Sequence, residues 1–458
     1  MRTVFVTGTG GAGRSTVAAA LALAGARRGE RVLLLSDEPP EALTGTGPGA
    51  PGPGPADPRG PGGSSGWGGS DGSRGSDGSS GSDSWSGSDG SGGSDSWSGS
   101  DGSGGSDSSG GSDGSGGSDA GPPGLTVARV DPAAGFRREF LGLQERAGAA
   151  LDLLGAVPFE DGELTELPGS EQFALLRALK QAAGDRHDLL VVDLPPVRQA
   201  VALLALPEQL RRYLRRLLPA ERQAARSLRP VLAQLAGVPM PAQWLYETAA
   251  RWDEELAAVQ ALIESPGASV RLVAEPGPEA ADHALRTARL GLALHGPAPD
   301  MVIANRVVPA GSGDPFLAAL SGRQQSALKG WREEFGDVPV REVAHTGRDP
   351  RQPGELAGLL DGPAGGTSGP LPGNRWTVED RRSEDGVLVW RLPLPGAAKD
   401  RLQLVRRDDE LFLTAGPFRR VLTLPSVLRR CAVSGAALRD GELRVRFEPD
   451  PALWPRSR

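Results

Sequence analysis

The N-terminal segment constrains the fold of this chain more than any other feature. Residues 3–16 read TVFVTGTGGAGRST. The apolar residues 4–6 are typical of a buried strand, residues 8–13 of a glycine-rich loop, and residues 15–26 of an alanine-rich helix. A loop between such a strand and helix directs backbone N–H groups at one point, where they can bind phosphate. The sequence therefore predicts an α/β fold that begins with a phosphate-binding loop.

The loop follows the P-loop pattern G-x-x-x-x-G-K-[ST] at every defined position except the lysine, where Arg14 stands. A planar guanidinium is bulkier than an ammonium group, so this exchange is not conservative inside a tight loop. The pattern favours nucleotide binding over fast turnover, and a purely structural turn is the alternative. The residues expected to bind nucleotide phosphates are Gly10, Gly11, Ala12, Gly13, Arg14, Ser15 and Thr16, with Ser15 also reaching a Mg²⁺ ion.

Three later segments combine an apolar strand with polar residues at its carboxyl end. Residues 32–39 read VLLLSDEP, residues 189–196 read LLVVDLPP, and residues 301–309 read MVIANRVVP. Ligands bind at the carboxyl ends of strands in parallel sheets, so Glu38, Asp193 and Asn305 are candidate site residues. For Glu38, an ordinary surface turn after a strand is an equally good interpretation.

Taken in order, these segments resemble the ArsA-type ATPases, which include arsenite-pump ATPases and the guided-entry ATPases that deliver tail-anchored membrane proteins. The family loop reads G-K-G-G-x-G-K-[ST]-[ST], and residues 8–16 keep its frame while Thr9 and Arg14 replace both lysines. In the family the first lysine reaches across a homodimer to the partner's nucleotide, which Thr9 cannot do. The resemblance implies ATP and Mg²⁺ as cofactors, a homodimer, and an ATPase whose hydrolysis is in question.

The same resemblance implies roles for the three strand-end residues. Asp193 would hold the Mg²⁺ ion through water, and Asn305 would hydrogen-bond the adenine. Glu38 stands where the family has an aspartate that helps to activate the attacking water, so Glu38 and Arg14 are the catalytic candidates. The carboxylate of Glu38 is one methylene longer, and positioning within an ångström affects rates strongly.

Residues 203–263 read as amphipathic helices rich in leucine, with Trp244 and Trp252. In the ArsA-type family this interval forms a hydrophobic groove for client transmembrane segments. The implied function is nucleotide-dependent binding or targeting of hydrophobic protein segments, as a chaperone. Ordinary packing between helices is the alternative interpretation.

Residues 44–124 consist largely of Gly, Ser, Pro and Asp, with a twelve-residue unit at 81–92 that recurs at 93–104. Such a composition lacks the apolar residues needed to offset ordering entropy, so the insert is expected to be disordered. Residues 66–119 hold nine aspartates and one arginine, whereas the whole chain carries a formal charge of −7. The acidity therefore belongs to the insert, and neither folded part predicts a nucleic-acid surface.

Cysteine and histidine are scarce. Cys431 is the single cysteine, and the four histidines are scattered, so the sequence predicts no zinc site and no disulfide. It shows neither a signal peptide nor a membrane-spanning run, which leads us to expect a cytoplasmic protein without an integral membrane segment.

The C-terminal region changes to short strands of alternating polarity at residues 387–394, 402–406, 411–414, 419–424 and 442–447. Its strands and turns resemble the small heat-shock (α-crystallin-like) domain that is appended to some bacterial ArsA-type proteins. The resemblance covers residues 374–449, after a Pro/Gly/Ser linker at 361–373 and before a tail at 450–458.

The expected architecture is a P-loop α/β domain of the MinD-like, signal-recognition class at residues 1–43 and 125–360, followed by an all-β sandwich. A second function is left open by the replaced lysines. In that alternative the chain is a catalytically dead pseudo-ATPase that serves as an interaction scaffold. A septum-positioning or plasmid-partition relative would share the P-loop but not the sandwich.

Overall fold

The computed structural model describes residues 1–44, 123–146, 148, 157–165, 167–218, 243–336, 338–360 and 376–454. Apart from its ends, the insert that we predicted to be disordered lies outside the described residues. The predicted linker at 361–373 also lies outside them. The middle of the predicted helical region also lies outside the described residues.

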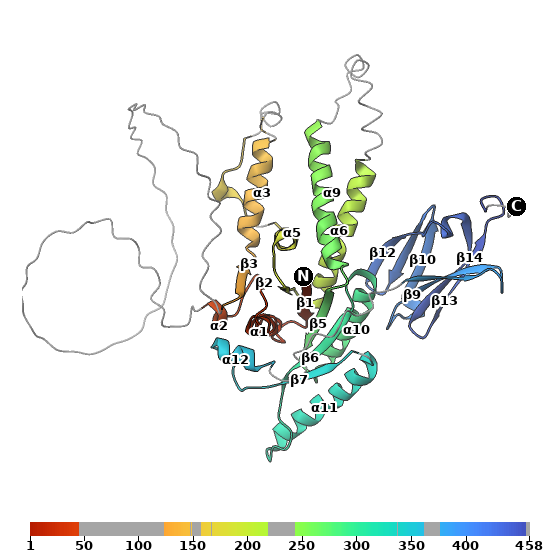
Figure 1. Ribbon diagram of the computed structural model, residues 1–458. Helices are drawn as coiled ribbons and strands as arrows, with labels where there is room; N and C mark the ends of the chain where they lie inside the picture. The colour runs from red at the N-terminus through yellow and green to blue at the C-terminus, as the bar shows by residue number, and fades with distance from the viewer. Residues whose placement is uncertain are drawn as a thin grey trace, which may run out of the picture. The chain divides into compact units, whose positions relative to one another are not determined.

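A seven-stranded parallel sheet forms the centre of the N-terminal part (Figure 1). Its strand order is β3-β2-β4-β1-β5-β6-β7, with every neighbouring pair parallel. The carboxyl ends of β2, β4 and β1 therefore lie at the same edge. The strands are β1 (Arg2–Gly8), β2 (Val32–Ser36), β3 (Leu125–Arg129), β4 (Leu189–Asp193), β5 (Ala268–Ala274), β6 (Pro299–Val307) and β7 (Val340–Ala344).

Helices cover both faces of this sheet, because successive strand residues point to opposite sides. Val4 and Val6 pack into one core with α1, whereas Phe5 packs into the other core with residues of α6 and α10. The helices are α1 (Arg14–Arg27), α2 (Glu41–Thr44), α3 (Pro132–Arg146), α5 (Ser170–Gly184), α6 (Val197–Leu217), α9 (Gln243–Ile263), α10 (Glu279–His295), α11 (Pro315–Phe335) and α12 (Pro353–Gly358). The predicted α/β fold class is confirmed.

Small side chains allow α1 to pack closely on the sheet. Its residues from Val17 to Leu23 are all buried, and four of these seven are alanines. A Cβ atom on Gly25 would lie 2.8 Å from Cδ2 of Leu189 in β4. Helix α1 is therefore held directly against the strand that ends in Asp193.

The C-terminal region is the predicted all-β domain, built from two antiparallel sheets. One sheet has the order β10-β11-β12 and the other β13-β14-β9-β8. Leu392, Leu413 and Phe447 are fully buried between them. The strands are β8 (Thr377–Arg381), β9 (Val387–Pro393), β10 (Leu402–Arg407), β11 (Glu410–Ala415), β12 (Phe418–Thr423), β13 (Cys431–Arg439) and β14 (Glu442–Pro449).

Two of these strands, β8 and β13, were not predicted from the sequence. Both lie at the edges of the four-stranded sheet, and most of their residues are exposed or half-buried. An edge strand buries few side chains, so it lacks the apolar alternation by which strands are found in a sequence. The sequence pattern therefore finds the central strands and misses these two edges.

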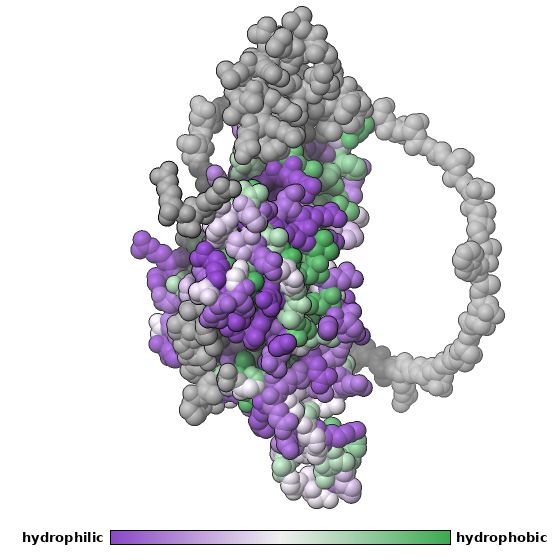
Figure 2. All heavy atoms as spheres, turned by 90° about the vertical axis from the view of Figure 1, so that its right-hand side faces the viewer, coloured by the Kyte–Doolittle hydropathy of each residue, from purple (hydrophilic) through white to green (hydrophobic). Residues whose placement is uncertain are grey.

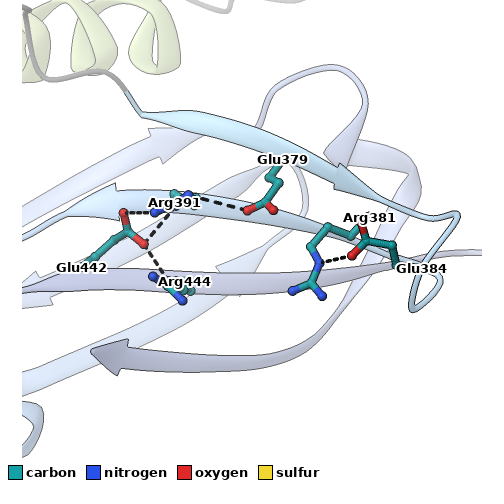
Figure 3. A network of polar contacts seen from close by, with 6 residues as sticks. All are labelled: Glu379, Arg381, Glu384, Arg391, Glu442 and Arg444. Atoms are coloured by element: carbon teal, nitrogen blue, oxygen red, sulfur yellow. Dashed lines mark hydrogen bonds and ion pairs between the residues drawn. The ribbon is translucent and has the colours of Figure 1, made fainter. Parts of the chain in front are cut away.

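A ladder of charged side chains runs across β8, β9 and β14 (Figure 3). Arg391 makes two hydrogen bonds to Glu442, both 2.9 Å long, and an ion pair of 3.7 Å with Glu379. Arg444 donates to the same Glu442 at 2.6 Å. Figure 2 shows hydrophilic side chains over much of one face of the molecule, with a band of hydrophobic side chains between them. The ladder fixes the register of three strands with charge pairs.

The sandwich packs against α6 and α10 through specific contacts. Arg212 of α6 makes a two-fold hydrogen bond to Glu410 of β11, at 3.0 and 2.8 Å. Arg420 of β12 pairs with Glu208 of α6 at 3.0 Å and lies 4.6 Å from the ring centre of Trp376. A Cβ atom on Gly291 of α10 would come within 2.7 Å of Phe418. The two folded parts are thus joined by an interface of ion pairs and close packing.

We expect the pair of Arg212 and Glu410 to stabilise this interface measurably, because it is bidentate and about two-thirds shielded from solvent. A double-mutant cycle with Arg212→Ala and Glu410→Ala should give a coupling free energy of about 1 kcal/mol in urea unfolding. The exposed pair of Lys329 and Glu333, whose charged atoms lie 4.0 Å apart, serves as the matched control and should show no measurable coupling. Equal coupling in both cycles would contradict the proposed importance of the interface pair.

Candidate functional site

The glycine-rich loop joins β1 to α1 and depends on glycine at particular positions. A Cβ atom on Gly8 would lie only 1.7 Å from the backbone oxygen of Val273 in β5. Gly11 and Gly13 have φ angles of 74° and 82°, in the left-handed region that other residues rarely adopt. A Cβ atom on Gly10 would meet nothing within 4 Å. The loop conformation therefore requires glycine at positions 8, 11 and 13, whereas position 10 has room for a side chain.

Asp193 ends β4 beside this loop and is buried, with 6% of its surface exposed. The Ser36 hydroxyl donates to its Oδ2 at 3.0 Å, whereas its Oδ1 has no hydrogen-bond partner among the described residues. Burial raises the pKa of Asp193, and the hydroxyls of Ser15 and Ser36 together with the charge of Arg14 oppose that rise. A buried carboxylate oxygen without a donor fits a site for a hydrated Mg²⁺ ion, which prefers oxygen ligands.

Arg14 contacts the backbone that follows Asp193. Its Nη1 donates to the backbone oxygen of Leu194, and the Thr7 hydroxyl donates to that of Pro195 at 2.7 Å. The Leu194 N–H donates to Val6 of β1 at 2.8 Å. Residues 194–195 are thus tied to β1 and to the P-loop arginine. Because α6 begins at Val197, two residues after Pro195, these contacts connect the P-loop to that helix.

Glu38 lies after β2 and is exposed to solvent. The neighbouring Asp37 is also exposed: its Oδ1 accepts the Glu38 N–H at 2.9 Å, and its charge adds to the effect of burial in raising the pKa of Asp193. The sequence interpretation chose Glu38 and did not consider Asp37. The signal for Asp37 was its position directly after the buried strand, one residue nearer to the sheet edge.

Asn305 and Arg306 hold the P-loop from β6. The Asn305 amide is buried and donates to the backbone oxygen of Ala12 at 2.7 Å, and Arg306 donates to that of Gly11 at 2.9 Å. Arg306 has a φ angle of 60° and pairs with Asp349 at 3.4 Å. A non-glycine residue in this conformation is uncommon and is often found at functional sites. Arg306 is a site residue that the sequence interpretation missed.

A cavity of about 230 Å³ lies beside these residues. Gly13, Thr16 and Asn305 line it from the P-loop side, and the loop after β7 closes the other side with residues 344–350. A second cavity of about 420 Å³ shares Thr346 and Arg348 with the first. The space next to Asn305 can therefore accept a group the size of a base or sugar, and residues 344–350 were not predicted from the sequence.

The structure thus brings the loop residues Gly10–Thr16 together with Asp193 and Asn305, and leaves Glu38 exposed at the neighbouring strand end. Within the described parts of the chain, no three His, Cys, Asp or Glu side chains are grouped so that they could hold a metal ion. The helices that the structure describes include none with the length and apolar character needed to cross a membrane.

Comparison with known proteins agrees with this geometry. Residues 1–46 and 122–359 match the sequence family described as anion-transporting ATPase, and residues 385–447 match the HSP20-like domain found in ArsA. An uncharacterized protein of Streptomyces coelicolor is 48% identical, with the full length of both chains aligned.

Two further relatives align over the N-terminal region. A protein of Mycobacterium tuberculosis is 33% identical over 64% of this chain and 71% of its own. A putative arsenical pump-driving ATPase of Aquifex aeolicus is 27% identical over 62% of this chain and 73% of its own. The P-loop fold and these matches together show that the chain belongs to the ArsA ATPase family and carries the HSP20-like domain found in that family.

Proposed function

We propose that this protein binds Mg²⁺-ATP at the P-loop and uses the nucleotide to control its binding, or its targeting, of hydrophobic protein segments. The observation that carries the nucleotide site is the partnerless Oδ1 of Asp193, buried at the sheet edge beside Ser15 and the P-loop. Ser15 and Asp193 would hold the Mg²⁺ ion, which supplies neutralising charge to the phosphates when it is bound. Backbone N–H groups of residues 10–16 would bind the phosphate oxygens.

The remaining site residues have roles at the two ends of the nucleotide. Asn305 lies at the cavity that would receive the base, and its hydrogen bond to Ala12 O places its amide group there. Glu38 would orient the attacking water, with Asp37 as a nearby carboxylate that could replace it. Positioning of the water is essential in phosphoryl transfer, because the transition state requires in-line attack.

Hydrolysis is expected to be weak or slow. Thr9 supplies no positive charge where the family has its first lysine, and charge stabilisation is the largest contribution to phosphoryl-transfer catalysis. The Arg14 guanidinium donates to Leu194 O, so at least part of it is directed at the protein backbone. This contact also favours the second candidate function, a pseudo-ATPase that serves as a scaffold.

Exposed apolar residues on several helices support binding of a hydrophobic segment. Phe173 of α5, Tyr213 of α6 and Trp252 of α9 are 52%, 52% and 42% exposed, and Leu217 at the end of α6 is 77% exposed. Helix α9 packs against both α5 and α6. Phe136 and Phe140 of α3 form an aromatic pair with ring centres 5.8 Å apart. These helices would present the client surface of a cytoplasmic homodimer.

Calorimetric titration with Mg²⁺-ATP tests the nucleotide site. We expect saturable binding to the parent protein and at least tenfold weaker binding to the Ser15→Ala/Asp193→Ala variant, because that variant loses both Mg²⁺ ligands. The Arg439→Ala variant, altered at an exposed residue of β13, should bind like the parent. Absence of binding to the parent at millimolar ATP would refute the proposed nucleotide site.

A second experiment separates the two candidate functions. Phosphate release is measured for the Thr9→Lys/Arg14→Lys variant, which restores both family lysines. Phosphate release faster than that of the parent would identify a weakened ATPase. Absence of turnover in both parent and variant, with Mg²⁺-ATP still bound, would identify the scaffold.

A further inference from the structure

A cleft separate from the P-loop lies between α6, α10 and the sandwich. Its volume is about 610 Å³, larger than either cavity beside the P-loop. Arg198 of α6, His283 and Arg286 of α10, and Arg401 beside β10 line it together with Gln403 and Thr414. The cleft therefore collects three guanidinium groups from three separate segments.

This lining is positively charged at neutral pH. Arg286 pairs with Glu334 at 3.1 Å, which offsets its charge. Arg198 and Arg401 have no ion-pair partner within the described ranges, and the lining of the cleft contains no carboxylate. Arg198 and Arg401 both line this open cleft, so an anion bound there could contact two guanidinium groups.

The walls of the cleft are held in place by the interface between the two folded parts. Arg212 and Glu208 of α6 pair with Glu410 and Arg420 of the sandwich. Phe418 packs against Gly291 of α10, where a larger residue would collide with it. These contacts hold α6, α10 and the sandwich together, so the backbone segments that carry the arginines are kept in place. A preformed site loses less entropy when its ligand binds.

We propose that this cleft binds a small soluble anion that carries phosphate groups. A guanidinium group matches the oxygen geometry of phosphate and can make two parallel hydrogen bonds to it. Gln403 and Thr414 add amide and hydroxyl groups for the polar body of such a ligand, and Leu290 and Pro417 add an apolar surface. The volume lies within the range of roughly 300–1,000 Å³ that is typical of small-molecule sites.

Pyrophosphate without added Mg²⁺ is the probe for this cleft, and the Ser15→Ala/Asp193→Ala variant is the background, because it removes both proposed Mg²⁺ ligands of the P-loop. Titration calorimetry at physiological salt should show saturable binding in this background. Adding Arg198→Ala and Arg401→Ala should weaken that binding at least tenfold. The Arg439→Ala change removes an equivalent exposed charge outside the cleft and should alter binding less than twofold.

Three outcomes would overturn the proposal. These are absence of binding in the P-loop variant background, unchanged binding after loss of the two arginines, and equal weakening by Arg439→Ala. Unaltered urea unfolding midpoints would show that the variants fold. Should the double replacement fail to fold, Arg198→Gln and Arg401→Gln are each expected to weaken binding about threefold or more, and wild-type affinity in both would refute the site.

The bound phosphate could belong to a lipid headgroup instead of a soluble molecule. Co-sedimentation with vesicles of phosphatidylcholine and phosphatidic acid tests this alternative. The proposal expects no vesicle binding that depends on Arg198 and Arg401. Vesicle binding that those two replacements abolish would overturn the assignment to a soluble ligand. The site does not depend on the proposed ATPase function, since the effect of losing Arg198 and Arg401 is measured in a chain that lacks both proposed Mg²⁺ ligands of the P-loop.

Discussion

Replacing Gly8 by alanine should destabilise the ATPase domain by about 3–5 kcal/mol, a large share of the roughly 5–15 kcal/mol that stabilises an ordinary domain. A Cβ atom at this position would lie 1.7 Å from the backbone oxygen of Val273 and 2.6 Å from its carbonyl carbon. Both are backbone atoms of β5, which pairs with β1 as far as Gly8 and Val273. They cannot move aside without separating two central strands, so the cost is large. Urea unfolding, or expression level if the variant does not fold, measures it.

The matched control is Gly10→Ala, two residues further along the same loop. Its Cβ atom would meet nothing within 4 Å, and Gly10 is not among the glycines with positive φ. We expect its unfolding free energy to lie within about 0.5 kcal/mol of the parent value. Similar losses in both variants would contradict the close approach of the P-loop to β5 and would indicate instead a general need for glycine in the loop.

Acidification should weaken the fold through His295 at the end of α10. This side chain is buried, and its burial together with the positive charge of Arg420 lowers its pKa to about 4. The same Arg420 pairs with Glu208, and the backbone of Arg419 makes a hydrogen bond to the imidazole. The charged groups facing His295 are therefore dominated by a cation from the sandwich, which opposes protonation.

The sign of the effect follows from the depressed pKa. Below the unfolded-state value of about 6.5, the unfolded chain takes up a proton that the folded chain still excludes, so stability is lost as the pH falls from about 6.5 towards 4. The loss should approach about 3 kcal/mol at the lower end. The unfolding free energy, measured by urea unfolding at several pH values in this range, should depend less on pH in His295→Gln than in the parent.

His345→Gln is the control for this experiment, because His345 is exposed. Its pH slope should match that of the parent. An unchanged slope in His295→Gln would show that the imidazole is not buried against the sandwich in solution. A slope reduced equally in both variants would also contradict the assignment to His295.

The sequence predicted the strands that bury apolar side chains better than the strands that are mostly exposed. Strands β1, β4 and β6 are buried on both faces, and their continuous apolar runs are visible in the sequence. The glycine positions of the P-loop were also predicted, because a strand, a glycine loop and a helix follow one another without interruption. The edge strands β8 and β13 were missed because exposed strands need no apolar alternation.

The candidate site was predicted in part for the same reason. Asp193 and Asn305 follow strongly apolar strands, and the structure places both beside the P-loop. Arg306 and the residues after β7 were missed, because their contacts with the loop join residues far apart in sequence. The interface pair of Arg212 and Glu410 spans 198 positions, and no local pattern distinguishes it from other arginines on a helix.

Helix α6 starts shortly after Asp193 and contacts the sandwich through Arg212 near its far end. From Val197 to Arg212 it advances about 23 Å at the standard rise per residue. A tilt of about 5° at its first turn would therefore displace Arg212 by about 2 Å, which is more than a hydrogen bond tolerates. A sub-ångström movement after Asp193 would in this way separate Arg212 from Glu410 and release the sandwich from α6.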